Sequence, residues 1–236
     1  MQRLLGISVL VFFSIFLSLS CDDKNNSAAP LLALGSGSGE QELSSDDAKA
    51  IAEETLATIM SAISKIPWAD LHNQFYPDKS SVSGGSSSSS GPLASISTGY
   101  TVTFYEEAGL KVDVGIADDW SGLILNVYLT NFQPSSSLPI GVSGSLNIFT
   151  TFTDWTEVKL VINTLPNKQL TINGIPLIKP TVALTDVTIY FDWYNLAVVD
   201  KAGYMGKITL LGFTFDFDPS WIAKIMDLLE GILPSL

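Results

Sequence analysis

Between residues 99 and 217 the chain consists mainly of short runs in which apolar and polar side chains alternate. Tyr100, Val102 and Phe104 alternate with threonines, and residues 110–116 alternate again after a turn. Further runs follow at 123–130, 142–153, 158–162, 170–172, 181–191 and 207–217. Alternation with period two is typical of strands that bury one face. About eight such strands with short connections favour a mainly antiparallel sheet over βαβ units.

The run from residue 181 to residue 191 departs from strict alternation. It is rich in β-branched residues, and its polar and apolar positions change phase near Asp186. Such a change is typical of a β-bulge, or of a strand that is covered on both faces. Both interpretations stay open at this point.

Two helices are expected to flank the strands. Residues 44–66 begin with hydroxyl and acidic residues suited to a helix N-terminus, carry one apolar stripe at helical spacing, and precede Pro67. Residues 219–233 follow Asp218 as a cap, and they are apolar on most sides. The segment 68–78 between the first helix and a serine-rich stretch is expected to be an irregular connector. The predicted fold class is α+β, an antiparallel sheet covered by an N-terminal and a C-terminal helix.

The N-terminus has the composition of an export signal. Arg3 supplies a positive charge, and the run from Leu4 to Leu19 is apolar apart from a glycine and three serines. As a helix this run would be about 24 Å long, which is short of a hydrocarbon core of about 30 Å. Cys21, the single cysteine of the chain, follows directly.

The residues Leu17-Ser18-Leu19-Ser20-Cys21 resemble the lipobox of bacterial lipoproteins, with Ser18 where leucine is most common. Ser20 before the cysteine is similar to the looser lipoboxes of spirochaete-like bacteria. The resemblance covers about 21 residues, and it implies cleavage before Cys21, three acyl chains on that residue, and export to a bacterial membrane, with the outer membrane expected. A plain secretory signal or an uncleaved membrane helix is the alternative. A lone cysteine in an exported protein forms no internal disulfide, which favours the lipid anchor.

The remaining boundaries follow from composition. Residues 1–20 form the signal peptide, 21–43 the lipidated cysteine and a flexible tether, and 44–78 the first helix with its connector. Residues 79–98, which include five consecutive serines, form either a linker or a long loop. Residues 99–236 form the β-rich domain with its closing helix.

The charge balance excludes several classes of partner. The chain has 24 acidic residues against 12 basic ones, and Arg3 is its only arginine. An acidic chain repels phosphate backbones, and without a guanidinium group it has no bidentate clamp for phosphate or carboxylate. We therefore expect no nucleic acid and no nucleotide as partner, and no cofactor.

Candidates for catalysis and metal binding are few. His72 is the only histidine, no G-x-S-x-G elbow is present, and a zinc or redox site is excluded. The paired acids Asp216 and Asp218, Asp118-Asp119 and Glu106-Glu107 allow a carboxylate hydrolase or a calcium site in principle. A helix cap at Asp218 and turn-forming roles for the other acids explain them more simply. The expected protein is not an enzyme and has no catalytic residue and no metal site.

The expected function is a membrane-anchored surface or periplasmic lipoprotein that binds a partner. An alternative is a carrier of an apolar or lipid-like ligand in a cavity between helices and sheet, with Trp221, Ile225 and Leu229 as lining. A sheet with a long terminal helix is loosely similar to the tubular lipid-binding family, in element order alone.

Overall fold

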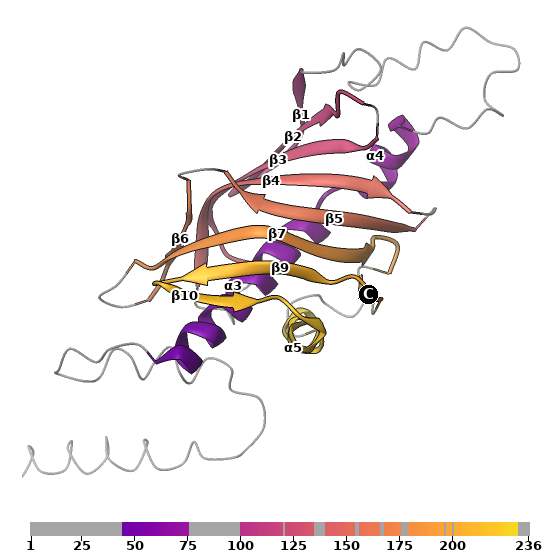
Figure 1. Cartoon of the computed structure of the whole chain (residues 1–236). Helices are drawn as coiled ribbons and strands as arrows, with labels where there is room; N and C mark the ends of the chain where they lie inside the picture. The colour runs from indigo at the N-terminus through magenta and orange to yellow at the C-terminus, as the bar shows by residue number, and fades with distance from the viewer. Residues whose placement is uncertain are drawn as a thin grey trace, which may run out of the picture.

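The structure is a computed structural model, and it describes residues 44–75, 100–119, 121–134, 140–153, 156–165, 168–175, 179–195, 197–199 and 201–230. Within these ranges one ten-stranded sheet forms the centre of the molecule, and every strand pair is antiparallel. The predicted mainly antiparallel sheet is therefore confirmed. Figure 1 shows the long helix α3 crossing one side of this sheet.

The main path of the sheet runs in the order β1-β2-β3-β4-β5-β7-β9-β10, while β6 pairs with β4 and β7, and β8 pairs with β7. The strands are β1 (Thr101–Glu107), β2 (Leu110–Ile116), β3 (Leu123–Phe132), β4 (Gly141–Phe152), β5 (Glu157–Thr164), β6 (Leu170–Asn173), β7 (Thr181–Asp192), β8 (Ala197–Val198), β9 (Met205–Leu210) and β10 (Phe213–Asp216). The helices are α3 (Ser45–Ser64), α4 (Trp68–Phe75) and α5 (Pro219–Glu230).

A capping box fixes the start of α3. The Ser44 hydroxyl accepts a hydrogen bond from the Asp47 N–H at 3.2 Å, and the Asp47 carboxylate accepts one from the Ser44 N–H at 3.3 Å. Two N–H groups that have no partner inside the helix are satisfied in this way. The predicted helix 44–66 is thus present over residues 45–64.

A second helix follows where an irregular connector was expected, so that prediction is wrong for residues 68–75. The Pro67 carbonyl accepts the Leu71 N–H at 3.1 Å, and the buried Trp68 donates its indole N–H to the Ile63 carbonyl at 2.9 Å. Proline lacks the N–H that would continue α3, but its carbonyl is free to begin a new helix. The eight residues of α4 make about two turns, which is too short for helical spacing to stand out in the sequence.

Alternation along the strands divides the sheet into two unlike faces. We call the face against α3 the inner face and the opposite one the outer face. Leu125, Ile148, Ile162 and Val187 are direct cross-strand neighbours on the inner face, and all four are fully buried. Residues at the positions between them point to the outer face, because successive side chains in a strand point to opposite sides.

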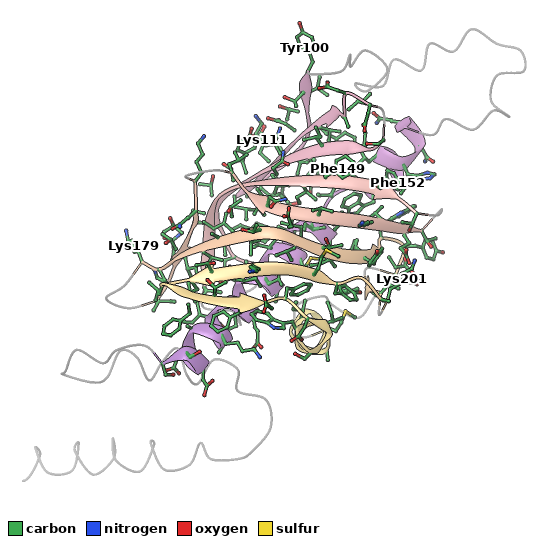
Figure 2. All side chains as sticks on the ribbon, in the orientation of Figure 1. Tyr100, Lys111, Phe149, Phe152, Lys179 and Lys201 are labelled. Atoms are coloured by element: carbon green, nitrogen blue, oxygen red, sulfur yellow. The ribbon has the colours of Figure 1, made fainter. Side chains whose placement is uncertain are left out.

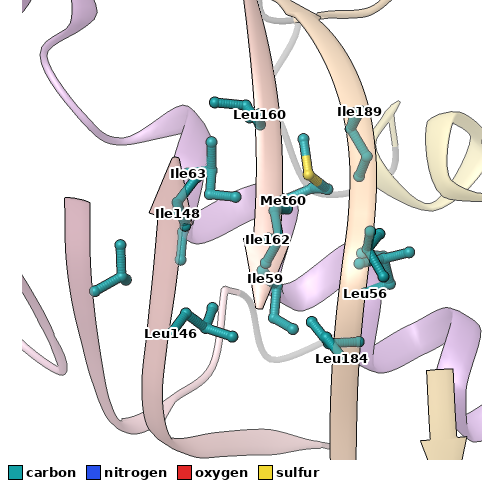
Figure 3. Close-up of a cluster of buried hydrophobic side chains, with 14 of the residues drawn as sticks. Leu56, Ile59, Met60, Ile63, Leu146, Ile148, Leu160, Ile162, Leu184 and Ile189 are labelled. Carbon is teal, nitrogen blue, oxygen red and sulfur yellow. The ribbon is translucent and has the colours of Figure 1, made fainter. Parts of the chain in front are cut away.

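The core lies between α3 and the inner face, as Figure 3 shows. The side chains that meet there, all at most 2% exposed, are Leu56, Ile59, Met60 and Ile63 from α3 and Leu146, Ile148, Leu160, Ile162, Leu184 and Ile189 from the sheet. Burial of each such side chain stabilises the fold by about 1.5–3 kcal/mol. The apolar stripe expected in the first helix is therefore part of the core.

The closing helix α5 packs against α3 and the end of the sheet near β8. Trp221 is 1% exposed, and the centre of its ring lies 6.1 Å from that of Phe215 and 6.1 Å from that of Phe217. The Asp218 carboxylate accepts the Ser220 N–H at 2.8 Å, which confirms Asp218 as the cap of this helix.

The phase change near Asp186 is a β-bulge. The register between β7 and β9 shifts between Thr185 and Thr188, and Asp186 has a φ of 51°. Opposite the bulge lies Gly206, whose φ is 128° and whose missing Cβ would lie 2.5 Å from the Val187 Cα. Only glycine allows so close a backbone approach in this conformation.

The predicted single strand 207–217 is instead the hairpin of β9 and β10, so the expected last strand is corrected. Leu211 and Gly212 form its turn with φ values of 50° and 86°. Two central residues with positive φ match the twist of a two-residue hairpin, but an apolar leucine is an uncommon first residue there. With the two-residue strand β8, which also was not predicted, the sheet has ten strands within the described residues rather than about eight.

Several predicted segments lie outside the described residues. They are the signal peptide 1–20, the tether 21–43 with Cys21, the serine-rich segment 79–98 and the end of the closing helix after residue 230. None of the described helices combines the length and the apolar character needed to cross a membrane.

Candidate functional site

The outer face carries a row of polar side chains in register across five strands. Thr103 on β1 is opposite Asp113 on β2, which is opposite Asn126 on β3; Asn126 is opposite Asn147 on β4, and Asn147 is opposite Asn163 on β5. We call these five residues the polar row. Direct cross-strand neighbours share a face and lie within contact distance. Figure 2 looks onto this face, with α3 behind the sheet.

Hydrogen bonds connect members of the polar row. The Thr103 hydroxyl donates to the Asp113 carboxylate at 2.8 Å, and the Asn147 amide nitrogen donates to the Asn126 amide oxygen at 3.1 Å. The Asn163 amide oxygen accepts the main-chain N–H of Asp186 at 2.7 Å and so joins the row to β7. These bonds hold the side chains in fixed orientations without burying them completely.

A row of apolar side chains runs beside the polar row. Ile124, Phe149 and Val161 are direct cross-strand neighbours two residues along β3, β4 and β5, and all three are half-buried. The outer face is therefore amphipathic, with amide groups beside hydrocarbon and the aromatic ring of Phe149, which Figure 2 labels.

The polar row ends at a hollow of about 700 Å³ in the outer face. We call it the β5–β7 hollow. Its polar lining residues are Asn163, Thr164, Lys168, Gln169, Thr181 and Thr185, and the other residues that line it are Leu165, Ala183 and Leu184. A hollow of this size falls within the range of small-molecule sites, about 300–1,000 Å³.

The hollow exists because β5 and β7 separate at this point. Backbone pairing between them covers Glu157 to Ile162 of β5, while the start of β7 pairs with β6 instead. In the gap, the Thr164 hydroxyl accepts the Leu184 N–H and donates to the Leu184 carbonyl, each at 3.3 Å. A threonine side chain thus replaces the backbone pairing of a neighbouring strand, and the strands are held apart.

A second, smaller hollow of about 350 Å³ lies at the β1–β3 side, next to Lys111 and Tyr128. The Lys111 ammonium lies 3.2 Å from Asp113 and 5.4 Å from the centre of the Tyr128 ring. Glu107 accepts hydrogen bonds from the Tyr105 hydroxyl and, at 2.9 Å, from Lys65. The Tyr105 hydrogen bond, with help from Lys65, lowers the pKa of Glu107, and the same hydrogen bond raises the pKa of Tyr105. Lys65 is therefore paired with Glu107, and Lys111 is paired with Asp113.

Trp221, Ile225 and Leu229 were proposed from the sequence as the lining of an apolar cavity. Trp221 and Ile225 are buried in the core beside α3, and the side chain of Leu229 lies outside the described residues. Cys21, the expected lipidation site, lies in a segment that the structure does not describe.

Two of the paired carboxylates, Asp119 and Asp218, are engaged locally. Asp119 accepts the Ser121 N–H at 2.9 Å and its hydroxyl at 2.5 Å, which makes it a turn-forming residue, and Asp218 binds Ser220 in the same way. The serine hydroxyl is the main cause that lowers the pKa of each of these two carboxyl groups. Among the described residues, no group of three or more His, Cys, Asp and Glu is arranged to hold a metal ion.

His72 lies in α4 among aromatic side chains and is 5% exposed. Its ring centre lies 5.0 Å from that of Phe152 in an edge-on arrangement and 6.0 Å from that of Trp193. These contacts are typical of aromatic packing.

Sequence reasoning missed the asparagines of the polar row. Asn126, Asn147 and Asn163 each occupy a polar phase of an alternating strand, where asparagine is uncommon. That composition was the available signal.

Comparisons with protein-family models, with curated proteins and with solved structures find no match for this chain. Its function is therefore inferred from the chemistry of its surface.

Proposed function

We propose that the protein is an exported, lipid-anchored bacterial lipoprotein whose folded part is a non-enzymatic binding module. The anchor is supported by the leader before Cys21 and by the resemblance of residues 17–21 to a lipobox. Two or more acyl chains hold a protein firmly at a membrane, whereas one chain holds it only marginally. The composition of residues 22–43, rich in Ser, Gly, Asn and Ala, favours a tether between this anchor and the fold.

The two faces of the sheet have different surroundings, and this difference supports a binding function. The N-terminal and C-terminal helices serve as the cover of the inner face, and the outer face is available to a ligand. The observation that carries this proposal is the polar row, which leads across the outer face into the β5–β7 hollow. Fixed polar groups beside an open hollow are typical of ligand sites.

A binding role is favoured over a hydrolase. A general acid of a glycosidase needs a raised pKa, because it must be protonated at the working pH. Asp119 and Asp218 instead have lowered pKa values and serve as a turn former and a helix cap. This role is also favoured over a lipid carrier, because the α3 side chains fill the space beside the inner face. Native lipid extraction and mass spectrometry test the carrier, for which a stoichiometric copurifying lipid is the signature.

The anchor is tested by growing cells that express the protein with radiolabelled palmitate. Wild-type protein is expected to carry the label, and Cys21→Ala is expected to lose it and to leave the membrane fraction. Ser20→Ala serves as a matched control, because it keeps the cysteine and a small residue before it. Label that persists in Cys21→Ala would contradict the proposed anchor.

A further inference from the structure

We propose that the β5–β7 hollow binds a neutral sugar unit, either free or at the end of a glycan chain. This inference rests on the proposed use of the outer face for binding, and it names the ligand class of that site. It is argued from the size of the hollow, its hydrogen-bonding groups, its charge and the state of its backbone.

The chemistry of the lining fits hydroxyl groups. Asn163 and Gln169 carry amides, each with donors and acceptors, and Thr181 and Thr185 carry hydroxyls that do both. A sugar presents hydroxyls that also donate and accept, so each one can pair with either kind of group. Because the Asn163 amide oxygen already accepts the Asp186 N–H, its NH₂ group is the part that remains for a ligand.

The same hollow also offers contacts for the apolar side of a sugar ring. Leu165 and Ala183 belong to the lining, and each threonine adds a methyl group. Contacts with these apolar groups bury C–H surface of the ligand, and the polar groups of the lining orient it by hydrogen bonds. A volume of about 700 Å³ falls within the range of small-molecule sites.

Charge favours a neutral ligand. Among the described residues that line the hollow, Lys168 is the one charged group, and none carries a carboxylate that could bind a cation. The exposed Asp186 lies next to Asn163, whose amide oxygen accepts its main-chain N–H. The chain as a whole has a formal charge of −12, which disfavours the approach of anions.

A peptide strand is a poorer fit for this place. Insertion of a strand between β5 and β7 would require unpaired main-chain groups on β7. The Thr164 hydroxyl occupies both the N–H and the carbonyl of Leu184, which are the groups that face β5. The hollow therefore offers side chains to a ligand rather than backbone.

The test uses the full-length protein, purified in a detergent that has no sugar headgroup, because maltoside or glucoside headgroups would compete for the hollow. Saturation-transfer NMR and calorimetry are run with defined neutral oligosaccharides of glucose, galactose, mannose and N-acetylglucosamine. Saturable binding of at least one of these probes is expected, and competition by its monosaccharide is expected to follow.

Three variants locate the binding. Ala183→Trp fills the hollow and is expected to abolish binding, and Gln169→Ala is expected to weaken it about tenfold, which corresponds to 1.4 kcal/mol. Thr101→Trp places the same bulk at an exposed position of the far strand β1, outside the polar row and the hollow, and it is expected to keep wild-type affinity. Amide NMR spectra of each variant confirm that it is folded.

The outcomes separate this inference from the proposed function. Failure of all four probe classes to bind the wild type would overturn the sugar proposal, and so would binding that Ala183→Trp leaves unchanged. Sugar binding that is lost in Thr101→Trp but kept in Ala183→Trp would overturn the hollow as the site and leave the outer face as the binding surface. If the wild type binds a peptide and Ala183→Trp blocks that binding, the ligand of the hollow is a peptide, and the sugar proposal is overturned. Palmitate labelling reports on the anchor independently of all these results.

Discussion

Thr164 and Leu184 are joined by two hydrogen bonds through a single side chain. The Thr164 hydroxyl accepts the Leu184 N–H and donates to the Leu184 carbonyl, each at 3.3 Å. This arrangement satisfies backbone groups that would otherwise lose their partners where β5 and β7 separate. It lets the sheet open into a hollow without breaking its continuity.

Thr164→Val is expected to destabilise the fold by about 1–3 kcal/mol, because valine keeps the shape but leaves the Leu184 N–H and carbonyl without the hydroxyl. Urea unfolding followed by circular dichroism measures the change. Thr151→Val, on the outer face of β4, is the matched control and is expected to stay within about 0.5 kcal/mol. Equal effects of the two substitutions would contradict the structural role of Thr164.

Gly206→Ala is expected to destabilise the fold by more than about 2 kcal/mol, because the added Cβ would lie 2.5 Å from the Val187 Cα. Gly212→Ala is a suitable control, since Gly212 also has a positive φ but has no heavy atom within 4 Å of an added Cβ. The thermal unfolding midpoints of the two variants separate the effect of the close contact at Gly206 from the strain of a positive φ, which both positions share. A larger loss in Gly212→Ala than in Gly206→Ala would be inconsistent with tight packing at the bulge.

Glu107 is expected to make stability depend on pH at the acid end. The Tyr105 and Lys65 hydrogen bonds lower its folded pKa below the ordinary value of 4.5. Its contribution is therefore present above pH 4.5 and is lost as the pH falls through the folded pKa.

Glu107→Gln should flatten this part of the stability curve, measured as the urea midpoint from pH 6 downward in steps to about pH 3. Glu106→Gln, at the neighbouring position, is the control and should leave the wild-type slope in place. Parallel stability curves for wild type and Glu107→Gln would mean that the pKa of Glu107 is the same in the folded and unfolded states, which would contradict this prediction.

Ser44→Ala is expected to cost about 1 kcal/mol, because the Asp47 N–H at the start of α3 loses its cap. Ser45→Ala, one residue later and inside the helix, is expected to change the free energy of unfolding by less than about 0.5 kcal/mol. Hydrogen exchange at the first turn of α3 gives a local readout. Unchanged exchange in Ser44→Ala would contradict the importance of the capping box.

The sheet was predictable because period-two alternation is a local property of the sequence, and the bulge at Asp186 left a local mark on that pattern. The helix α4 was missed because Pro67 ends one helix and begins the next. The turn at Leu211 was missed because leucine gives no turn signal. The polar row and the β5–β7 hollow depend on register between distant strands, as between Asn126, Asn147 and Asn163, and a single sequence does not specify that register.

The proposed anchor at Cys21 implies that the outer face meets its proposed ligand at a membrane, and the intact mass of the protein from the membrane fraction tests this anchor most directly. The account predicts a chain that begins at Cys21, without residues 1–20, with a mass increase from acyl chains confined to the N-terminal peptide. A cytosolic chain that retains Met1 through Ser20 and has no added mass at Cys21 would contradict it.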